Sequence, residues 1–425
     1  MTPKHLAALA AVTLSAAVIG ATALTAGGST TFESSQRVRV IATGELGTVD
    51  HVLGDRVVVF GDGTAAPLRT YPPSDLEPAT PPATTTTTST TTAPTTSWNG
   101  FGIGNWPTAT WRPYLASSPF NQPVGSTTVH PDSAAIITRS LSFGNGVGNL
   151  VDAAGASNDY AHPTYYAKPT DPIFTLDGVS SSTGIEGLRI PIPDKARPAG
   201  GSDAHMTVVT PDGWEYDFWQ VKDKPAGGGT MTFSNGGRIR IDGDGLRGRA
   251  TAANFGNLAG VIRAQELIAG RIDHALFIVI KCTTRDTTFG YGTTAASYNG
   301  SSYVWPATHA ASPCATSMTG LVPAGARFQL AMSDAQIQAL TVPVWKKTIL
   351  TALARYGGYV GDTGGPGFGF MFESSTMYTS LGQPDPLAEF AKTNNVPTWN
   401  GQYVFNMNNG VDWAKYLRVV VPPTP

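Results

Sequence analysis

Residues 204–220, AHMTVVTPDGWEYDFWQ, contain two strand-like runs on either side of Pro211-Asp212-Gly213. Proline fixes φ and glycine permits a positive φ, so the tripeptide predicts a tight turn and the stretch predicts a β-hairpin. With a three-residue loop, one face carries His205, Thr207, Val209, Glu215, Asp217 and Trp219. The other face carries Met206, Val208, Tyr216 and Phe218. A two-residue loop would place Asp217 among those apolar side chains at a high desolvation cost, so the three-residue register is predicted.

The polar face of this hairpin carries candidate catalytic groups. A histidine, two carboxylates and an indole on one strand pair indicate a site that handles sugars. Glu215 or Asp217 would stabilise charge or act as a nucleophile, and His205 would transfer protons. Trp219 and Gln220 would contact the substrate.

The N-terminal residues 1–28 have the pattern of a secretory signal peptide. Lys4 precedes an apolar run, and Ala21-Thr22-Ala23 matches a small-residue cleavage site. The protein is therefore expected to be secreted, and either extracellular or associated with the cell wall. A retained membrane anchor is the alternative, because the apolar run is just long enough to span a bilayer. Once the segment is cleaved, no membrane association is expected.

The rest of the chain divides into two modules and a linker. Residues 36–78 contain short valine-rich runs separated by glycine-containing turns, which predicts a small β module. Residues 79–97 are almost entirely Thr, Pro and Ala and predict a disordered linker. Residues 98–425 form the large module, with two helices predicted at 252–268 and 344–356 among many strands. This pattern predicts a mostly-β fold, a β-sandwich or jelly roll decorated by helices.

Composition restricts the partners. Charged residues make up 14% of the chain and the net charge is -2, so neither nucleic acid nor a polybasic membrane contact is expected. The only two cysteines, Cys282 and Cys314, predict a disulfide in an exported protein. A monomer is expected.

Several catalytic and cofactor motifs are missing. The chain contains no GxSxG elbow, no phosphate-binding GxxxxGK[ST] and no GxGxxG in a strand-to-helix context. No cofactor is expected. Asp242 and Asp244 have the spacing that begins a calcium loop, but the later ligands of such a loop are missing.

Further candidates lie outside the hairpin. Glu373 follows the aromatic run 368–372 and would supply a second carboxylate for glycoside hydrolysis, the alternative being a solvated charge at a strand end. His274 begins a predicted strand, 272–282, and would orient or relay a proton. The alternative for His274 is a hydrogen-bonded core residue. Asp362, before a glycine-rich run, is expected to be a turn residue.

Two short stretches resemble known families. Residues 215–220, EYDFWQ, resemble the signature strand Glu-x-Asp-x-(x)-Glu of laminarinase-type, concanavalin-like β-sandwich glycoside hydrolases. The resemblance implies that Glu215 is a nucleophile and Asp217 a helper carboxylate. Gln220 stands where that family has its general acid, and a glutamine cannot donate the catalytic proton. Residues 44–60, GELGTVDHVLGDRVVVF, resemble small SH3-like barrels, which implies a wall-binding or partner-binding module or a spacer.

These residues predict a secreted carbohydrate-active enzyme that cleaves an extracellular or cell-wall polysaccharide, with glycoside hydrolysis ahead of β-elimination. A polysaccharide lyase would use His205 as the base, with Arg238, Arg240 or Gln220 neutralising a uronate carboxylate. Trp305, inside the loop closed by the predicted disulfide, would bind sugar rings. A non-catalytic glycan-binding protein and a structural surface protein are the remaining alternatives.

Overall fold

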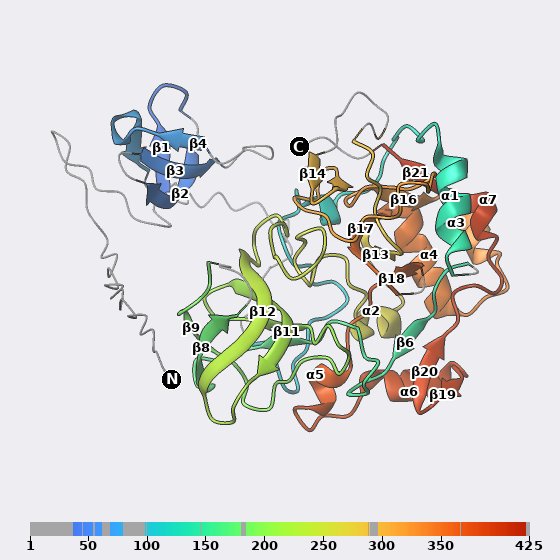
Figure 1. Cartoon of the computed structure of the whole chain (residues 1–425). Coiled ribbons are helices and arrows are strands. Elements are labelled where there is room, and N and C mark those ends of the chain that lie inside the picture. Colours follow the sequence, from blue (N-terminus) through green and yellow to red (C-terminus); the bar gives the residue numbers. More distant parts are fainter. Residues whose placement is uncertain are drawn as a thin grey trace, which may run out of the picture. The chain divides into compact units, whose positions relative to one another are not determined.

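The computed structural model describes residues 37–44, 46–53, 56–61, 69–79, 98, 100–144, 146–179, 184–287, 289, 296–365 and 367–421. The chain divides into two compact units, residues 1–91 and 92–425, whose elements are labelled in Figure 1. The predicted signal peptide, and the predicted linker apart from Ala79, lie outside the described residues. No helix in the described part of the chain is long and apolar enough to cross a lipid bilayer.

The smaller unit is one antiparallel sheet with the strand order β4-β3-β2-β1-β5. The strands are β1 (Arg37–Val40), β2 (Leu46–Leu53), β3 (Arg56–Gly61), β4 (Arg69–Tyr71) and β5 (Leu76–Pro78), with the 3-10 helix η1 (Pro73–Asp75) before β5. Its core contains every second residue of β1 and β3, together with one leucine, namely Val38, Val40, Val57, Val59 and Leu76. The prediction of a small β module is confirmed at this level.

Two mixed sheets dominate the larger unit (Figure 1). The first has the order β7-β10-β11-β12-β8-β9, from β7 (Thr164–Tyr166), β8 (Ile173–Gly178), β9 (Arg189–Pro191), β10 (Met206–Val209), β11 (Trp214–Asp223) and β12 (Gly229–Arg240). The second has the order β18-β13-β17-β16-β21, from β13 (Leu276–Ile280), β16 (Arg327–Leu330), β17 (Gly358–Thr363), β18 (Phe368–Phe370) and β21 (Leu417–Val420). Smaller sheets are formed by β6 (Leu150–Asp152), β14 (Ala296–Tyr298), β15 (Ser301–Tyr303), β19 (Thr398–Trp399) and β20 (Gln402–Phe405). The mostly-β prediction is confirmed at this level.

The hairpin at residues 204–220 has the predicted register. Thr207 lies opposite Asp217, and Val209 lies opposite Glu215. Hydrogen bonds from Thr210 N to Trp214 O and from Gly213 N to Thr210 O close a three-residue loop. Both faces are buried, however, so the polar face of the hairpin is not an open surface.

One of the two predicted helices is confirmed. Helix α4 (Val344–Arg355) buries the predicted stripe of Ile349, Leu350 and Leu353, and Gly357 follows it with a φ of +68°. The structure also has α1 (Ser133–Ser142), α3 (Asp334–Gln338), α5 (Thr376–Thr379), α6 (Pro386–Thr393), α7 (Trp413–Tyr416) and η2 (Pro119–Asn121), which the sequence did not indicate to us.

The helix predicted at 252–268 is wrong over most of its length. Only α2 (Ala264–Ala269) is helical, and it ends at Gly270 as expected. The preceding residues form a loop whose backbone N–H groups bond to buried carboxylates rather than to helical carbonyls. Gly260 has a φ of +78°, and a Cβ there would lie 2.6 Å from Phe277 N. The apolar spacing that imitates a helix therefore belongs to a loop pressed against β13.

The two main sheets share one hydrophobic core cluster, which includes Met206 and Phe218 from the first sheet and Phe277 and Tyr359 from the second. A second cluster packs β13, β16 and β21 against α1 and α4. The second sheet is thus covered by helices on one side and by aromatic side chains on the other. The main polar clusters of the larger unit lie within and beside the shared core.

The predicted disulfide between Cys282 and Cys314 is present, with a sequence separation of 32 residues. Replacing both cysteines by serine is expected to lower the free energy of unfolding of the larger unit by about 3–4 kcal/mol, because the unfolded chain regains the entropy of that loop. All 9 tryptophans lie in the larger unit, so tryptophan fluorescence during denaturant unfolding measures the change. Reducing the wild-type disulfide should give a comparable loss, and an unchanged midpoint in both samples would contradict the prediction.

Candidate functional site

Glu215 and Asp217, the two predicted catalytic carboxylates of the hairpin, lie beneath the loop that precedes α2. Asp217 accepts hydrogen bonds from Asn257 N at 3.1 Å and from Thr207 Oγ1 at 3.0 Å. Glu215 accepts from Leu258 N at 3.0 Å and from Tyr114 Oη at 2.7 Å. Neither residue has exposed surface. In this conformation the pair holds the loop and does not meet solvent.

The two carboxyl groups share their protonation. Burial raises the pKa of Glu215 to about 7, and burial together with the nearby Glu215 raises the pKa of Asp217. Since each carboxyl group alters the titration of the other, the two protons belong to the pair rather than to either residue.

His205 lies beside a second histidine that the sequence analysis did not select. The ring centroids of His162 and His205 are 4.5 Å apart, and both rings are buried. Burial lowers the pKa of His205 to about 4 and that of His162 well below its ordinary value, so both are neutral at pH 7. None of the hydrogen bonds in the described part of the chain joins His205 to Asp217.

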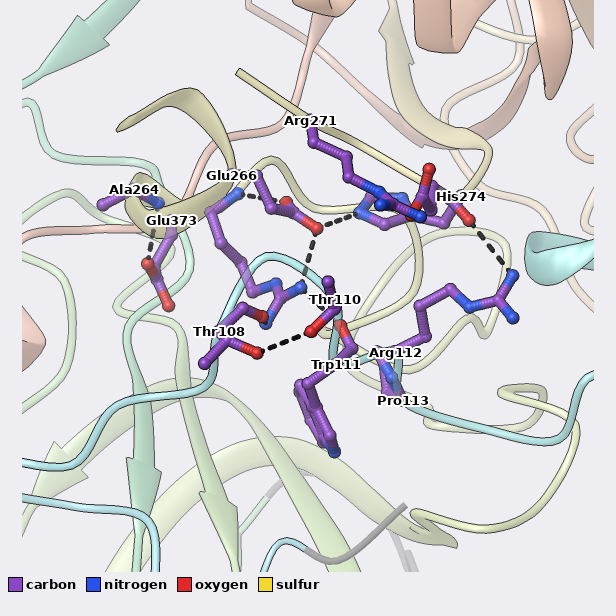
Figure 2. A network of polar contacts seen from close by, with 12 residues as sticks. Thr108, Thr110, Trp111, Arg112, Pro113, Ala264, Glu266, Arg271, His274 and Glu373 are labelled. Carbon is purple, nitrogen blue, oxygen red and sulfur yellow. Dashed lines mark hydrogen bonds and ion pairs between the residues drawn. The ribbon is translucent and has the colours of Figure 1, made fainter. Parts of the chain in front are cut away.

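A second polar cluster surrounds Glu373, three residues after the end of β18. The side chain is almost fully buried, with 3% of the residue exposed, so the prediction of a solvated charge is wrong. Its Oε2 accepts hydrogen bonds from Tyr378 Oη at 3.1 Å and from Ala264 N at 3.2 Å, the second of which is drawn in Figure 2. Gln265 Nε2 donates to Tyr378 Oη at 2.8 Å. The Trp106 ring packs against the Tyr378 ring, with the two ring centroids 4.6 Å apart.

Next to Glu373 lies a buried ion pair between Arg263 and Glu266. Glu266 Oε1 accepts from Arg263 Nη2 at 2.7 Å and from His274 Nε2 at 3.0 Å (Figure 2). The Arg263 N–H donates to Glu266 Oε2 at 2.9 Å, which satisfies the N-terminus of α2. His274 is thus a hydrogen-bonded core residue, and it lies before β13 rather than in it. No hydrogen bond described for the chain connects His274 with His205 or Asp217.

The two glutamates of this cluster titrate very differently. Against the effect of burial, Arg263 and His274 lower the pKa of Glu266 to about 2. Burial raises the pKa of Glu373 to about 7, although Arg263 acts in the opposite direction. A permanently ionised carboxylate therefore lies near one that exchanges a proton close to neutral pH. Such a split is typical of acid–base sites.

The cluster also has unused hydrogen-bonding capacity. Tyr166 Oη is buried without a partner among the described residues, and its charge environment includes Arg263 and Glu373. Its ring packs against Phe101 and Trp111. Because buried polar groups are nearly always bonded, an orphaned hydroxyl here indicates a place for a water molecule or a polar ligand. We call Glu373, Tyr378, Tyr166, Arg263 and Glu266 the Glu373 site.

The four predicted substrate-binding residues lie apart from these contacts. Trp219 Nε1 donates to Asp203 Oδ1 at 3.3 Å. Gln220 has a φ of +52° and accepts from Ser234 Oγ at 2.8 Å. Arg240 pairs with Asp242 at 2.9 Å, and Trp305 precedes a cis proline and is partly exposed. The described contacts connect none of the four to the Glu373 site.

The acidic loop that resembles a calcium site is neutralised by arginines. Asp242 is held by Arg240, and Asp244 is paired with Arg247 at 3.2 Å. No group of three or more His, Cys, Asp or Glu side chains able to hold a metal ion occurs among the residues that the structure describes.

Sequence reasoning missed most of the Glu373 site, namely Arg263, Glu266, Tyr166 and Tyr378. Arg263 and Glu266 occupy the N-cap and N3 positions of α2, a spacing that can mark the start of a helix. We did not recognise it because we predicted that the helix begins at residue 252. The expectation for Asp362 is also wrong, since it lies inside β17 and burial raises its pKa to about 7. It is not in a turn because β17 continues pairing with β13 through Thr363.

Comparison of the chain with protein-family models, curated proteins and solved structures finds no significant match. The laminarinase-type resemblance therefore rests on residues 215–220 alone, and function has to be argued from the geometry of the site.

Proposed function

We propose that the larger unit belongs to a secreted enzyme that cleaves an extracellular or cell-wall polysaccharide by hydrolysis, with Glu373 as the proton donor. The observation that carries this proposal is the arrangement around Glu373, whose carboxyl group accepts from Tyr378 Oη and Ala264 N beside the Arg263–Glu266 ion pair. Its pKa, raised by burial to about 7, agrees with that role. Glycoside hydrolysis needs a carboxylic acid that is still protonated near neutral pH. A group whose pKa matches the working pH both donates and recovers the proton.

The surroundings of Glu373 support a sugar substrate. Tyr378 bonds to the carboxyl group and packs against the partly exposed ring of Trp106. Aromatic rings present apolar faces of the kind that cover the C–H faces of sugars, and the free Tyr166 hydroxyl would bond to a sugar hydroxyl. Glu215 and Asp217 support the loop that leads to Arg263 and Ala264, which makes them positioning residues in this proposal.

At the Glu373 site, which does not include the lyase base His205 predicted from the sequence, the two tyrosines favour hydrolysis over β-elimination. A lyase needs a basic group to remove a carbon-bound proton. Burial raises the pKa of both Tyr166 and Tyr378 well above the ordinary value, so both hydroxyls stay protonated and are poor bases. A protonated tyrosine is instead suited to hydrogen-bond with Glu373 and the leaving group.

The proposal includes two finer assignments of fold. The larger unit is a β-sandwich, supported by the core cluster that the two main sheets share. The smaller unit is an SH3-like barrel that binds the cell wall or another partner, supported by its five-stranded antiparallel sheet.

The test uses the Glu373→Gln variant on a panel of plant and bacterial-wall polysaccharides. New reducing ends and the absorbance of unsaturated uronates are followed together, because only a lyase produces the absorbance. We expect the wild type to release reducing ends without absorbance and Glu373→Gln to be at least about 100-fold slower, since glutamine cannot donate the proton. The matched control is Glu389→Gln, an exposed glutamate of α6, which should keep full activity.

The pH dependence of stability verifies that Glu373→Gln is folded and that Glu373 titrates as described. The pKa of Glu373 is raised from 4.5 to about 7, so its stabilising contribution is complete below pH 4.5 and is lost as the pH rises through 7. Glutamine resembles the protonated acid. The variant should therefore gain about 3 kcal/mol relative to the wild type between pH 4.5 and pH 8.5. A folded variant with wild-type activity would refute the catalytic role.

Non-catalytic glycan binding is the second candidate, and a different surface favours it. The Arg238 guanidinium lies 4.2 Å from the centre of the partly exposed Trp214 ring, and Arg240 lies 5.2 Å from it. Arg238 donates one hydrogen bond among the described residues, to Tyr216 Oη at 3.5 Å, so most of its donors are free. The expected result for this second candidate is that neither reducing ends nor unsaturated uronates are produced, while the protein is retained on an immobilised acidic polysaccharide. That outcome would favour glycan binding at this surface over polysaccharide cleavage.

A further inference from the structure

A pocket of about 260 Å³ lies at the N-terminal end of α4, away from every residue discussed so far as catalytic. Pro343, Trp345 and Lys346 form one wall. Residues 394–397, before β19, and residues between 404 and 410, from β20 onward, form the others. The pocket therefore joins three segments that are distant in sequence.

The pocket has an unbalanced positive charge. Lys346 is its only charged lining residue, and only 2% of Lys346 is exposed. The ammonium group donates to Asn409 O at 2.8 Å and lies 5.6 Å from the centre of the Trp345 ring, but it has no carboxylate partner among the described residues. A buried cation without a counter-ion is costly, so an anion that entered the pocket would be bound favourably.

Two further donors reinforce this preference. The first turn of α4 leaves backbone N–H groups without intrahelical acceptors, and the helix dipole makes this end positive. The Trp345 indole N–H is buried and has no partner among the described residues. Neither the helix end nor the lysine faces an acidic side chain in the pocket lining.

The rest of the lining suits a small polyhydroxylated ring. Asn394, Asn395 and Asn406 contribute amide groups, while Val396 and Val404 contribute apolar surface. The volume is slightly below the usual range for drug-sized ligands, which corresponds to one ring rather than an oligomer. Trp399, two residues beyond the lining residue Pro397, is 63% exposed and offers an aromatic face to a neighbouring sugar.

We propose that this pocket binds a single negatively charged sugar unit, with the acid group held by Lys346 and the start of α4. The ring would lie against the valines, and its hydroxyls would bond to the asparagines. The pocket is a binding site separate from the Glu373 site, and its occupation does not depend on Glu373 chemistry. An acidic sugar held here would anchor an anionic glycan chain to the larger unit.

Isothermal titration of the full chain with glucuronate, glucose 6-phosphate and glucose tests the proposal. We expect at least one of the two acids to bind, and glucose to bind at least about tenfold more weakly than that acid. The acid that binds identifies carboxylate or phosphate as the preferred group. Lys346→Met removes the ammonium and retains the buried stem, and should weaken acid binding by at least about tenfold.

Lys347→Met is the matched control, because Lys347 is the next residue of α4, does not line the pocket and bonds to Gln338 O. It should leave binding unchanged. Trp345→Phe removes one donor and should weaken acid binding by a smaller factor, about threefold to tenfold. Thermal melting verifies that each variant is folded. The proposal is overturned if neither acid binds, if glucose binds equally well, or if folded Lys346→Met binds like the wild type.

Discussion

Replacing Asp217 by alanine is expected to lower the free energy of unfolding of the larger unit by about 2–6 kcal/mol, one of the two largest effects predicted here. The substitution leaves Asn257 N and Thr207 Oγ1 buried without their acceptor. Each unsatisfied buried polar group adds its own desolvation cost. The loss should appear as a lower midpoint in denaturant unfolding followed by tryptophan fluorescence.

Asp217→Asn is the matched control for this prediction. Asparagine has nearly the same shape and its amide oxygen accepts the hydrogen bond from Asn257 N, so most of the stability should remain. The comparison also separates structure from catalysis. The hairpin sequence predicts that Asp217 takes part in the reaction, in which case folded Asp217→Asn would lose turnover. A fully stable Asp217→Ala would show that the carboxylate does not hold the loop.

Replacing Arg263 by methionine is expected to cost about 3–5 kcal/mol, because it removes the guanidinium paired with the buried Glu266 and leaves His274 as the remaining side-chain partner of that carboxylate. Arg263 is 2% exposed, and its guanidinium also donates to Trp111 O at 2.7 Å. The pKa of Glu266 is held at about 2 chiefly by Arg263. In the wild type this contribution to stability is complete above the ordinary pKa and is lost as the pH falls towards 2. The stability of the Arg263→Met variant should therefore lack this decrease at low pH.

The double variant Arg263→Met, Glu266→Gln tests the origin of the loss. Neutralising Glu266 removes the stranded charge, so the double variant should be more stable than Arg263→Met alone. Unfolding by urea at pH 7 and at pH 3 measures both effects. If the single variant unfolds like the wild type at both pH values, the ion pair does not stabilise the core.

Much of the local structure was predictable from residue patterns. Pro211-Asp212-Gly213 defines the loop of the hairpin, and alternation then sets which side chains share a face. The stripe of Ile349, Leu350 and Leu353 locates α4, and a single pair of cysteines indicates one disulfide. The valine runs of residues 36–78 predict the smaller sheet. The first, second and fourth of these signals come from residues close in sequence. The disulfide could be predicted because the chain has only two cysteines, so no other pairing is possible.

The chemistry of the polar clusters depends on contacts between distant segments. Glu215 and Asp217 are buried because residues 245–258 fold over them, and the loop conformation is stabilised by those same carboxylates. The sequence of the hairpin alone does not predict the burial of the two carboxylates, and the sequence of residues 245–258 alone does not predict the conformation of the loop. The apolar spacing of residues 252–268 even imitates a helix.

Glu373 shows the same division most clearly. Its position after an aromatic strand is evident in the sequence, and so is its identity as an acid. Its pKa near 7 follows from burial, from Arg263 and from Ala264 N, 109 residues earlier in the chain. Residue types and their spacing thus establish which groups are available for chemistry and which elements carry them. Desolvation and long-range charge, which exist only in the folded chain, establish which of those groups exchanges a proton near neutral pH.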